Sequence, residues 1–169
     1  MAKPQPGDYG IYYENYVNRV SAANLHEAVT QYSQLLTDFF TTLPEQKADY
    51  QYAPGKWSLK DLLQHIIDTE RIMSYRLLRI ARKDTTPLPG FEEAEYATNA
   101  NATNRSFSAL KEELTALRKS TDLLIQSFTE DQLAYAGTVS GNSATANAIG
   151  YIIFGHLLHH QQIVEERYL

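Results

Sequence analysis

Apolar residues recur every three or four positions in four long stretches of the chain, and proline or glycine marks the breaks between these stretches. Such spacing puts the apolar side chains on one face of an α-helix. No stretch has the convincing alternation of apolar and polar residues that indicates a β-strand, and there is no internal repeat. The sequence therefore restricts the chain to folds in which helices pack against helices.

Residues that start and stop helices support these assignments. Ser58 suits an N-cap, and Asp61 suits the positive end of the helix dipole that follows. Pro44 ends the first apolar stretch. The predicted helices span residues 24–42, 58–80, 106–128 and 145–169.

Four helices with two longish connections predict an all-α four-helix bundle. A chain of 169 residues fits a single domain, residues 1–169, with residues 1–20 as an N-terminal extension. This extension contains a short aromatic segment that could cover an edge of the bundle or a dimer surface. Its tyrosines are Tyr9, Tyr12, Tyr13 and Tyr16.

Residues 84–105 form a connection that breaks the helical pattern with prolines, a glycine and several small polar residues. A connection of this length in a compact domain is usually functional or carries a short helix of its own, which residues 92–96 could form. We expect residues 87–104 to form a wall of a substrate pocket. A second break is predicted at residues 137–142.

The composition removes several classes of function. The chain has no cysteine, which excludes disulfides, thiolate nucleophiles and cysteine-based metal sites, and leaves imidazole and carboxylate as the strong metal ligands. A net charge of −5 argues against nucleic acid as a partner, because phosphate binding needs a concentrated basic surface. One basic cluster follows Asp68 and Glu70, and we interpret it as a solvated helix face, with an anion-binding rim as the alternative. It comprises Arg71, Arg76, Arg79, Arg82 and Lys83.

The sequence predicts a cytoplasmic protein with no membrane partner. Its first residues lack the apolar core of a signal peptide. The longest apolar run, residues 148–158, is well short of the roughly 20 residues that span a bilayer.

Three histidines are candidates for a metal site. His156 and His160 are four residues apart, so they lie on one face of a helix, and His156 follows Ile152 and Ile153 on the apolar stripe. His65, on the apolar face of another predicted helix, would have to converge with them. Three imidazoles leave coordination positions open, as catalytic metal sites do. Alternatively, His156 and His160 are ordinary polar residues near a helix end, and His65 is a hydrogen-bonded histidine of the core.

Other residues and motifs are weaker candidates. His159 is displaced by about 100° from His160 around the helix, so we expect it at the rim or the surface. We assign no function to His26, which lies on the polar side of its helix. Zinc-protease, di-iron, phosphate-loop and nucleophile-elbow motifs are all absent.

Two motifs carry a resemblance to a known family. Residues 54–70 read PGKWSLKDLLQHIIDTE, and residues 148–160 read AIGYIIFGHLLHH. The first is similar to a Trp-Ser-(helix)-His-x-x-Asp signature and the second to a late His-x-x-x-His helix, both of the DinB-like family, which includes the YfiT-type metal-dependent hydrolases. The resemblance extends from about Leu25 to the last residue.

The resemblance implies an up–down–down–up four-helix bundle, often dimeric, that holds a divalent metal with three histidines. Nickel, zinc and other divalent ions all occur in the family's sites, and we expect zinc or nickel here. At the matching positions these are His65, His156 and His160. Relatives include metal-dependent hydrolases and S-transferases that use a low-molecular-weight thiol such as bacillithiol or mycothiol. The family therefore implies a small-molecule substrate and a homodimer.

Two functional hypotheses follow. The first is a metalloenzyme whose ion activates a thiol for S-transfer to electrophiles, in detoxification or a stress response, or activates water for hydrolysis. Asp68 could orient a ligand or act as a base there, although a solvent-facing helix carboxylate is the simpler interpretation. The second hypothesis is a non-catalytic, stress-related dimeric bundle with a structural or vestigial metal site.

Overall fold

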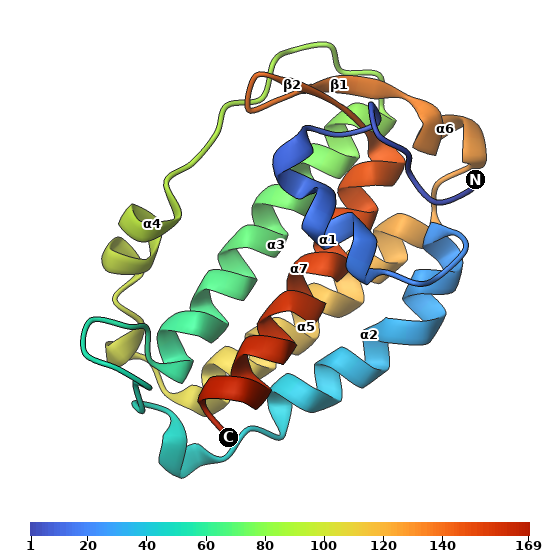
Figure 1. Ribbon diagram of the computed structural model, residues 1–169. Coiled ribbons are helices and arrows are strands. Elements are labelled where there is room, and N and C mark those ends of the chain that lie inside the picture. The colour runs from blue at the N-terminus through green and yellow to red at the C-terminus, as the bar shows by residue number, and fades with distance from the viewer.

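The computed structural model describes residues 1–169 and confirms the all-α class (Figure 1). Seven α-helices are joined by short 3-10 turns and by one small hairpin. The helices are α1 (Glu14–Arg19), α2 (Leu25–Thr41), α3 (Leu59–Ala81), α4 (Glu93–Ala100), α5 (Phe107–Gln126), α6 (Glu130–Ala134) and α7 (Ala146–Arg167).

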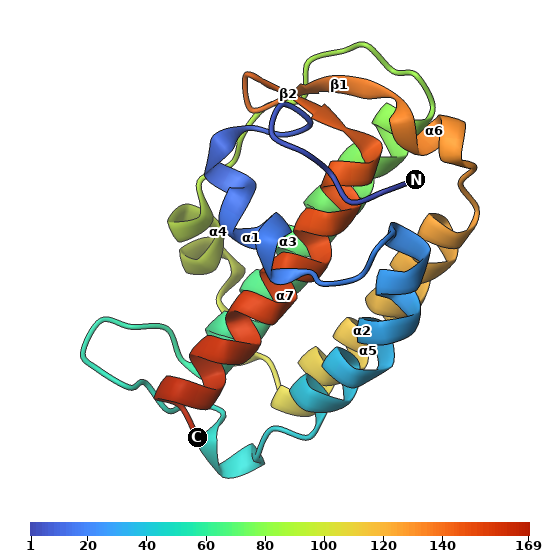
Figure 2. The same cartoon turned by 45° about the vertical axis from the view of Figure 1, so that its right-hand side comes forward.

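Helices α2, α3, α5 and α7 form the bundle. Helices α3 and α5 run in one direction, and α2 and α7 run in the other, which gives the up–down–down–up order (Figures 1 and 2). Helix α3 packs against α5 and α7, and α2 packs against the same two helices. The two helices that carry the candidate histidines, α3 and α7, are therefore direct neighbours.

Side-chain caps explain where these helices begin. Ser58 accepts a hydrogen bond from the backbone N–H of Asp61, and the Asp61 carboxylate accepts one from the backbone N–H of Ser58. This capping box satisfies two backbone donors that the first turn would otherwise leave unpaired. Thr145 caps α7 with a single bond, in which its side-chain oxygen accepts from the backbone N–H of Ala148. The caps fix the register of α3 and α7, and with it the direction in which their histidines point.

The expectation that the chain has no strand was wrong. Strands β1 (Ala136–Val139) and β2 (Asn142–Thr145) form an antiparallel hairpin over the predicted break. Ser140 and Gly141 make its turn with positive φ angles of 49° and 79°, as a two-residue turn of type I′ requires. Each strand has only four residues, too few to show a periodic pattern. Leu88 from the long connection bonds to the hairpin through Thr138 and Ser140.

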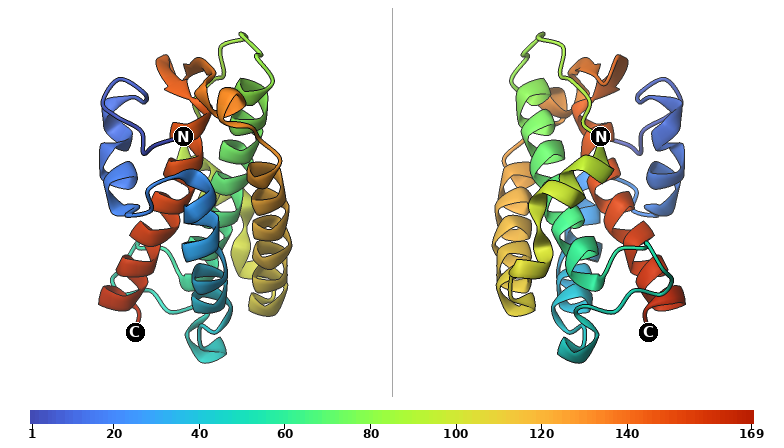
Figure 3. Two further views of the ribbon diagram at one scale, coloured as in Figure 1. Left: turned by 90° about the vertical axis from the view of Figure 1, so that its right-hand side faces the viewer. Right: turned by 90° about the vertical axis from the view of Figure 1, so that its left-hand side faces the viewer.

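The N-terminal aromatic segment lies along α7, so it covers an edge of the bundle (Figure 3). Gly155 on α7 makes this contact possible. A Cβ atom at Gly155 would lie 2.0 Å from the backbone oxygen of Tyr16 on α1. The missing side chain therefore lets α1 approach α7 closely enough to reach the candidate site.

Replacing Gly155 with alanine is expected to destabilise the protein by about 1–3 kcal/mol, the usual range for overpacking a closed contact. This loss would come despite the better helix propensity of alanine. Urea unfolding measures it. The control is Gly90→Ala, where a Cβ would meet nothing closer than 3.5 Å. Equal stability of the two variants would contradict the close α1–α7 contact.

None of the helices has the length and the apolar character needed to cross a membrane.

Candidate metal centre

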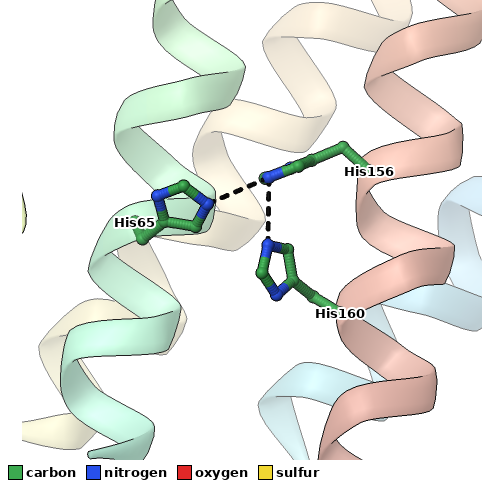
Figure 4. A group of neighbouring side chains, drawn as sticks. All are labelled: His65, His156 and His160. Atoms are coloured by element: carbon green, nitrogen blue, oxygen red, sulfur yellow. Dashed lines mark hydrogen bonds between the residues drawn. The ribbon is translucent and has the colours of Figure 1, made fainter. Parts of the chain in front are cut away.

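The structure brings His65, His156 and His160 together, with one nitrogen from each ring inside a group no more than 4.8 Å across (Figure 4). Nε2 of His156 lies 3.0 Å from Nε2 of His65 and 3.0 Å from Nε2 of His160. His65 projects from α3, and the other two project from successive turns of α7. The antiparallel neighbours α3 and α7 thus supply the convergence that the sequence alone left open.

All three rings are buried, with 5%, 5% and 7% of His65, His156 and His160 exposed. Burial lowers the pKa of His65 to about 4, because an imidazolium ion is poorly stabilised away from water. Burial also holds the pKa of His156 and of His160 well below the ordinary value. The rings are therefore neutral at neutral pH, which is the form that binds metals.

Hydrogen bonds among the rings cannot satisfy the three nitrogens. A neutral imidazole has one N–H donor and one acceptor nitrogen. Nε2 of His156 faces two other Nε2 atoms, both at 3.0 Å, and a single nitrogen can serve only one of these contacts well. A cation accepts a lone pair from every nitrogen, and metal–nitrogen distances of about 2.0–2.1 Å suit nitrogens this close together. The donor set therefore fits a divalent metal ion.

Aromatic rings, and no hydrogen-bond acceptors, hold the imidazoles in place. Trp57 packs on His65 with ring centroids 4.7 Å apart, and Tyr16 packs edge-on to His156 at 5.6 Å. Metal-ligating histidines usually donate the N–H of the second ring nitrogen to an acceptor. Nδ1 of His160 is buried and has no such partner. Ring orientation therefore depends on packing here.

A cavity of about 620 Å³ borders His156. Gly90 to Ala94 from the long connection line it, which agrees with the expectation that this segment is a pocket wall. The N-terminal tyrosines and the hairpin line other parts of it. The core helices α3 and α7 also contribute to its wall, through Thr69, Met73, Arg76 and Ile152.

A second cavity, of about 310 Å³, borders His160 and shares no lining residue with the first. It is largely aromatic and apolar, with Tyr52, Trp57 and Tyr168 in its wall. The histidine cluster is therefore in contact with two separate cavities.

The structure does not bring Asp68 to the histidines. Its carboxylate accepts a hydrogen bond from Nε2 of Gln64 at 2.9 Å, and it lines a different cavity, with Tyr96 and Asn99. Partial burial raises its pKa. The residue is half-buried, so it matches neither the solvent-facing carboxylate nor a group beside the candidate metal.

Replacing Asp68 with asparagine is expected to leave the metal content unchanged and to change kcat by no more than about threefold. A positioned general base typically raises the rate by 10²–10⁴-fold, but a carboxylate outside both cavities contributes little to proton transfer. Metal analysis and steady-state kinetics on the variant measure this. A hundredfold loss of kcat with normal metal content would instead assign Asp68 as a base.

The remaining histidines lie outside the cluster. His159 is half-buried, and Tyr16 packs edge-on to it with centroids 5.5 Å apart. His26 lies on α2 and does not belong to the three-histidine group.

The interpretation of the basic cluster as a solvated face is wrong for one member. Arg76 is only 2% exposed and lines the larger cavity, whereas Arg71, Arg82 and Lys83 are exposed. A second buried arginine, Arg118, pairs with Glu70. Sequence reasoning missed both, because charged residues are almost never fully buried unless paired. The only available signal was that Arg76 follows Met73 by three residues and Thr69 by seven, which places it on the same face of its helix.

Comparison with known proteins shows the family of the chain. Residues 28–164 match the DinB superfamily, so the chain belongs to that family. A relative from Oceanobacillus iheyensis, "Putative metal-dependent hydrolase OB0413", is 24% identical over 148 residues, which are 84% of this chain and 84% of the relative.

Two solved structures share the fold. YfiT from Bacillus subtilis, described as "a probable metal-dependent hydrolase with an unusual four-helix bundle topology", superposes with a TM-score of 0.66 at 16% identity, covering 99% of this chain and 94% of YfiT. A mycothiol-dependent maleylpyruvate isomerase also superposes with a TM-score of 0.66, at 15% identity, and the match covers 82% of this chain and 59% of the isomerase chain. These likenesses confirm the four-helix bundle.

Proposed function

We propose that this protein is a metal-dependent hydrolase in which His65, His156 and His160 hold a zinc or nickel ion. The observation that carries the proposal is the convergence of three buried, neutral imidazoles beside a cavity of about 620 Å³. A divalent ion bound there would lower the pKa of a water molecule or a thiol and so supply a nucleophile near neutral pH. The names of the Oceanobacillus relative and of YfiT support hydrolysis.

The surrounding residues support this chemistry. Trp57 and Tyr16 restrict the rings of His65 and His156, so little reorganisation is needed when a substrate enters. Met73 and Ile152 give part of the cavity an apolar wall. The cavity volume is in the range that holds small molecules, roughly 300–1,000 Å³. We propose a small ester or amide as the substrate.

Transfer of a low-molecular-weight thiol to an electrophile is the second candidate. The cavity beside His160 favours it, because a reaction between two molecules needs room for both at the cluster. The mycothiol-dependent isomerase with the same fold is consistent with such use.

The proposal is tested on protein purified without a histidine tag. We expect about one zinc or nickel ion per chain by mass spectrometry of the metals, and hydrolysis within a panel of p-nitrophenyl esters and anilides that a chelator abolishes and added metal restores. Adding bacillithiol or mycothiol with monochlorobimane tests S-transfer. Full metal occupancy without turnover in either assay would favour the non-catalytic bundle, and substoichiometric metal would overturn the proposal.

We also propose a homodimer, for which light scattering on the same preparation provides the test.

A further inference from the structure

Arg76 is a buried cation without an acidic partner. Only 2% of it is exposed, and no carboxylate lies within ion-pair distance of its guanidinium group. An arginine remains charged even in an apolar environment. Removing such a charge from water without pairing it costs several kcal/mol, so its retention at a cavity wall calls for an explanation.

The contacts of Arg76 leave it able to bind a ligand. Nη2 donates to the backbone oxygen of Pro89 at 2.7 Å and to Oγ of Ser140 at 3.4 Å. Nη1 contacts the sulfur of Met73 at 3.6 Å, and sulfur is a weak acceptor. Phe91 packs against the group at 5.6 Å. Of the five N–H donors of the guanidinium, two have no protein acceptor, and neither Pro89 nor Ser140 supplies a negative charge.

A second unpaired polar group lies between Arg76 and the histidines. Oγ1 of Thr69 is buried, has no hydrogen-bond partner and belongs to the same cavity. His65, Thr69, Met73 and Arg76 are four, four and three residues apart, so they form one stripe along α3. At about 1.5 Å per residue, the stripe is roughly 16 Å long between its end Cα atoms. Arg76, Thr69 and His156 line the same cavity, so one ligand in it can contact all three.

The only carboxylates of this cavity lie at its exposed side. Glu92 and Glu93 are exposed at the start of α4 and do not pair with Arg76. The cavity therefore has a buried cationic end and an open acidic edge.

We propose that the larger cavity binds an elongated small molecule with a carboxylate at one end. Arg76 pairs with the carboxylate, Thr69 hydrogen-bonds to a polar group in the middle, and the opposite end reaches the histidine cluster. The assignment of that opposite end as the reacting end rests on the proposed function. The carboxylate pocket itself does not, because Arg76 and Thr69 bind without the metal.

The test compares 4-phenylbutyrate with its uncharged isostere 4-phenylbutyramide, using ligand-observed NMR titration of the protein as purified and again after metal removal by a chelator. We expect the carboxylate to bind at least about tenfold more tightly than the amide in both preparations, as an added charge-assisted hydrogen bond predicts. Arg76→Met should abolish the preference, and Arg76→Lys should retain part of it. Arg82→Met, which removes an exposed arginine at the end of the same helix, should leave it unchanged.

The outcomes separate this inference from the proposed function. A preference that Arg76→Met leaves intact, or no preference in the unmodified protein, overturns the inference. A preference seen only with metal and insensitive to Arg76→Met would place the carboxylate at the metal, which overturns the inference and leaves the proposed function standing. If the protein has no hydrolytic activity but prefers the carboxylate in a way that depends on Arg76, the carboxylate pocket is supported and the proposed hydrolase function is not. Should Arg76→Met fail to fold, the Nε–H resonance of Arg76 in the unmodified protein must shift with 4-phenylbutyrate and not with the amide.

Discussion

Replacing His156 with alanine is expected to lower metal affinity by more than 100-fold and to abolish turnover. His156 has the central position in the cluster, because its Nε2 lies 3.0 Å from both other ring nitrogens. Loss of a group that only supports a metal ligand typically costs 10–100-fold in affinity, so loss of a ligand itself should cost more. Competition with a chromogenic chelator measures the affinity, and the hydrolysis assay measures turnover.

His159→Ala is the matched control. It removes an imidazole from the same helix, next to His160, but this ring does not belong to the three-histidine group. We expect the metal affinity of His159→Ala to stay within about threefold of that of the unmodified protein. Equal losses in the two variants would show that the effect comes from α7 as a whole, and an unchanged affinity in His156→Ala would refute the three-histidine assignment.

Replacing Arg118 with methionine is expected to destabilise the protein by about 3–5 kcal/mol, the usual cost of leaving one member of a buried ion pair alone. Arg118 and Glu70 are joined at 2.7 Å, and both side chains are only 2% exposed. The variant keeps the apolar stem but leaves the Glu70 carboxylate among the core helices. For a domain of this size, the melting temperature should fall by roughly 10 °C.

Two variants make the Arg118 experiment specific. Arg118→Met combined with Glu70→Leu removes both charges of this buried pair and should recover most of the lost stability. Asp122, the second partner of Arg118, is only partly buried and keeps its hydrogen bond from Ser33. Arg71→Met breaks an ion pair with Glu113 at the surface and should cost at most about 1 kcal/mol. If Arg71→Met were as destabilising as Arg118→Met, burial would not be the cause of the effect.

The sequence predicted the bundle helices well because their boundaries depend on local chemistry. The expected helix at residues 58–80 is observed as Leu59–Ala81, with Ser58 as its cap. The hairpin and α6 were missed, because elements of four and five residues are too short to show a period. Their positions depend on contacts with distant segments, such as the bonds between Leu88 and the hairpin.

The histidines could be chosen from the sequence because helical spacing placed His156 beside His160, and because the family pattern added His65. The charged residues of the interior could not. Whether Arg76 is solvated depends on where residues 89–91 cross it, and this crossing follows from the path of a connection that has no periodicity. Arg118 has one partner four residues further along its own helix, Asp122, but the buried partner Glu70 lies 48 residues away on another helix, a separation that local patterns do not encode.

The walls of the larger cavity and the histidines belong to parts of the chain with different tolerance to change. The histidines stand on two long, capped, buried helices, where a shift would disturb the whole core. The core helices α3 and α7 supply one part of the wall, and the rest comes from the hairpin, the N-terminal segment and the residues at the start of α4, which are surface pieces from three distant regions of the sequence. Surface connections accept insertions and substitutions far more readily than core helices do. Substrate range can therefore diverge between homologues through these walls while the chemistry of the cluster stays constant, and differences in wall length should predict differences in the molecules that each homologue accepts.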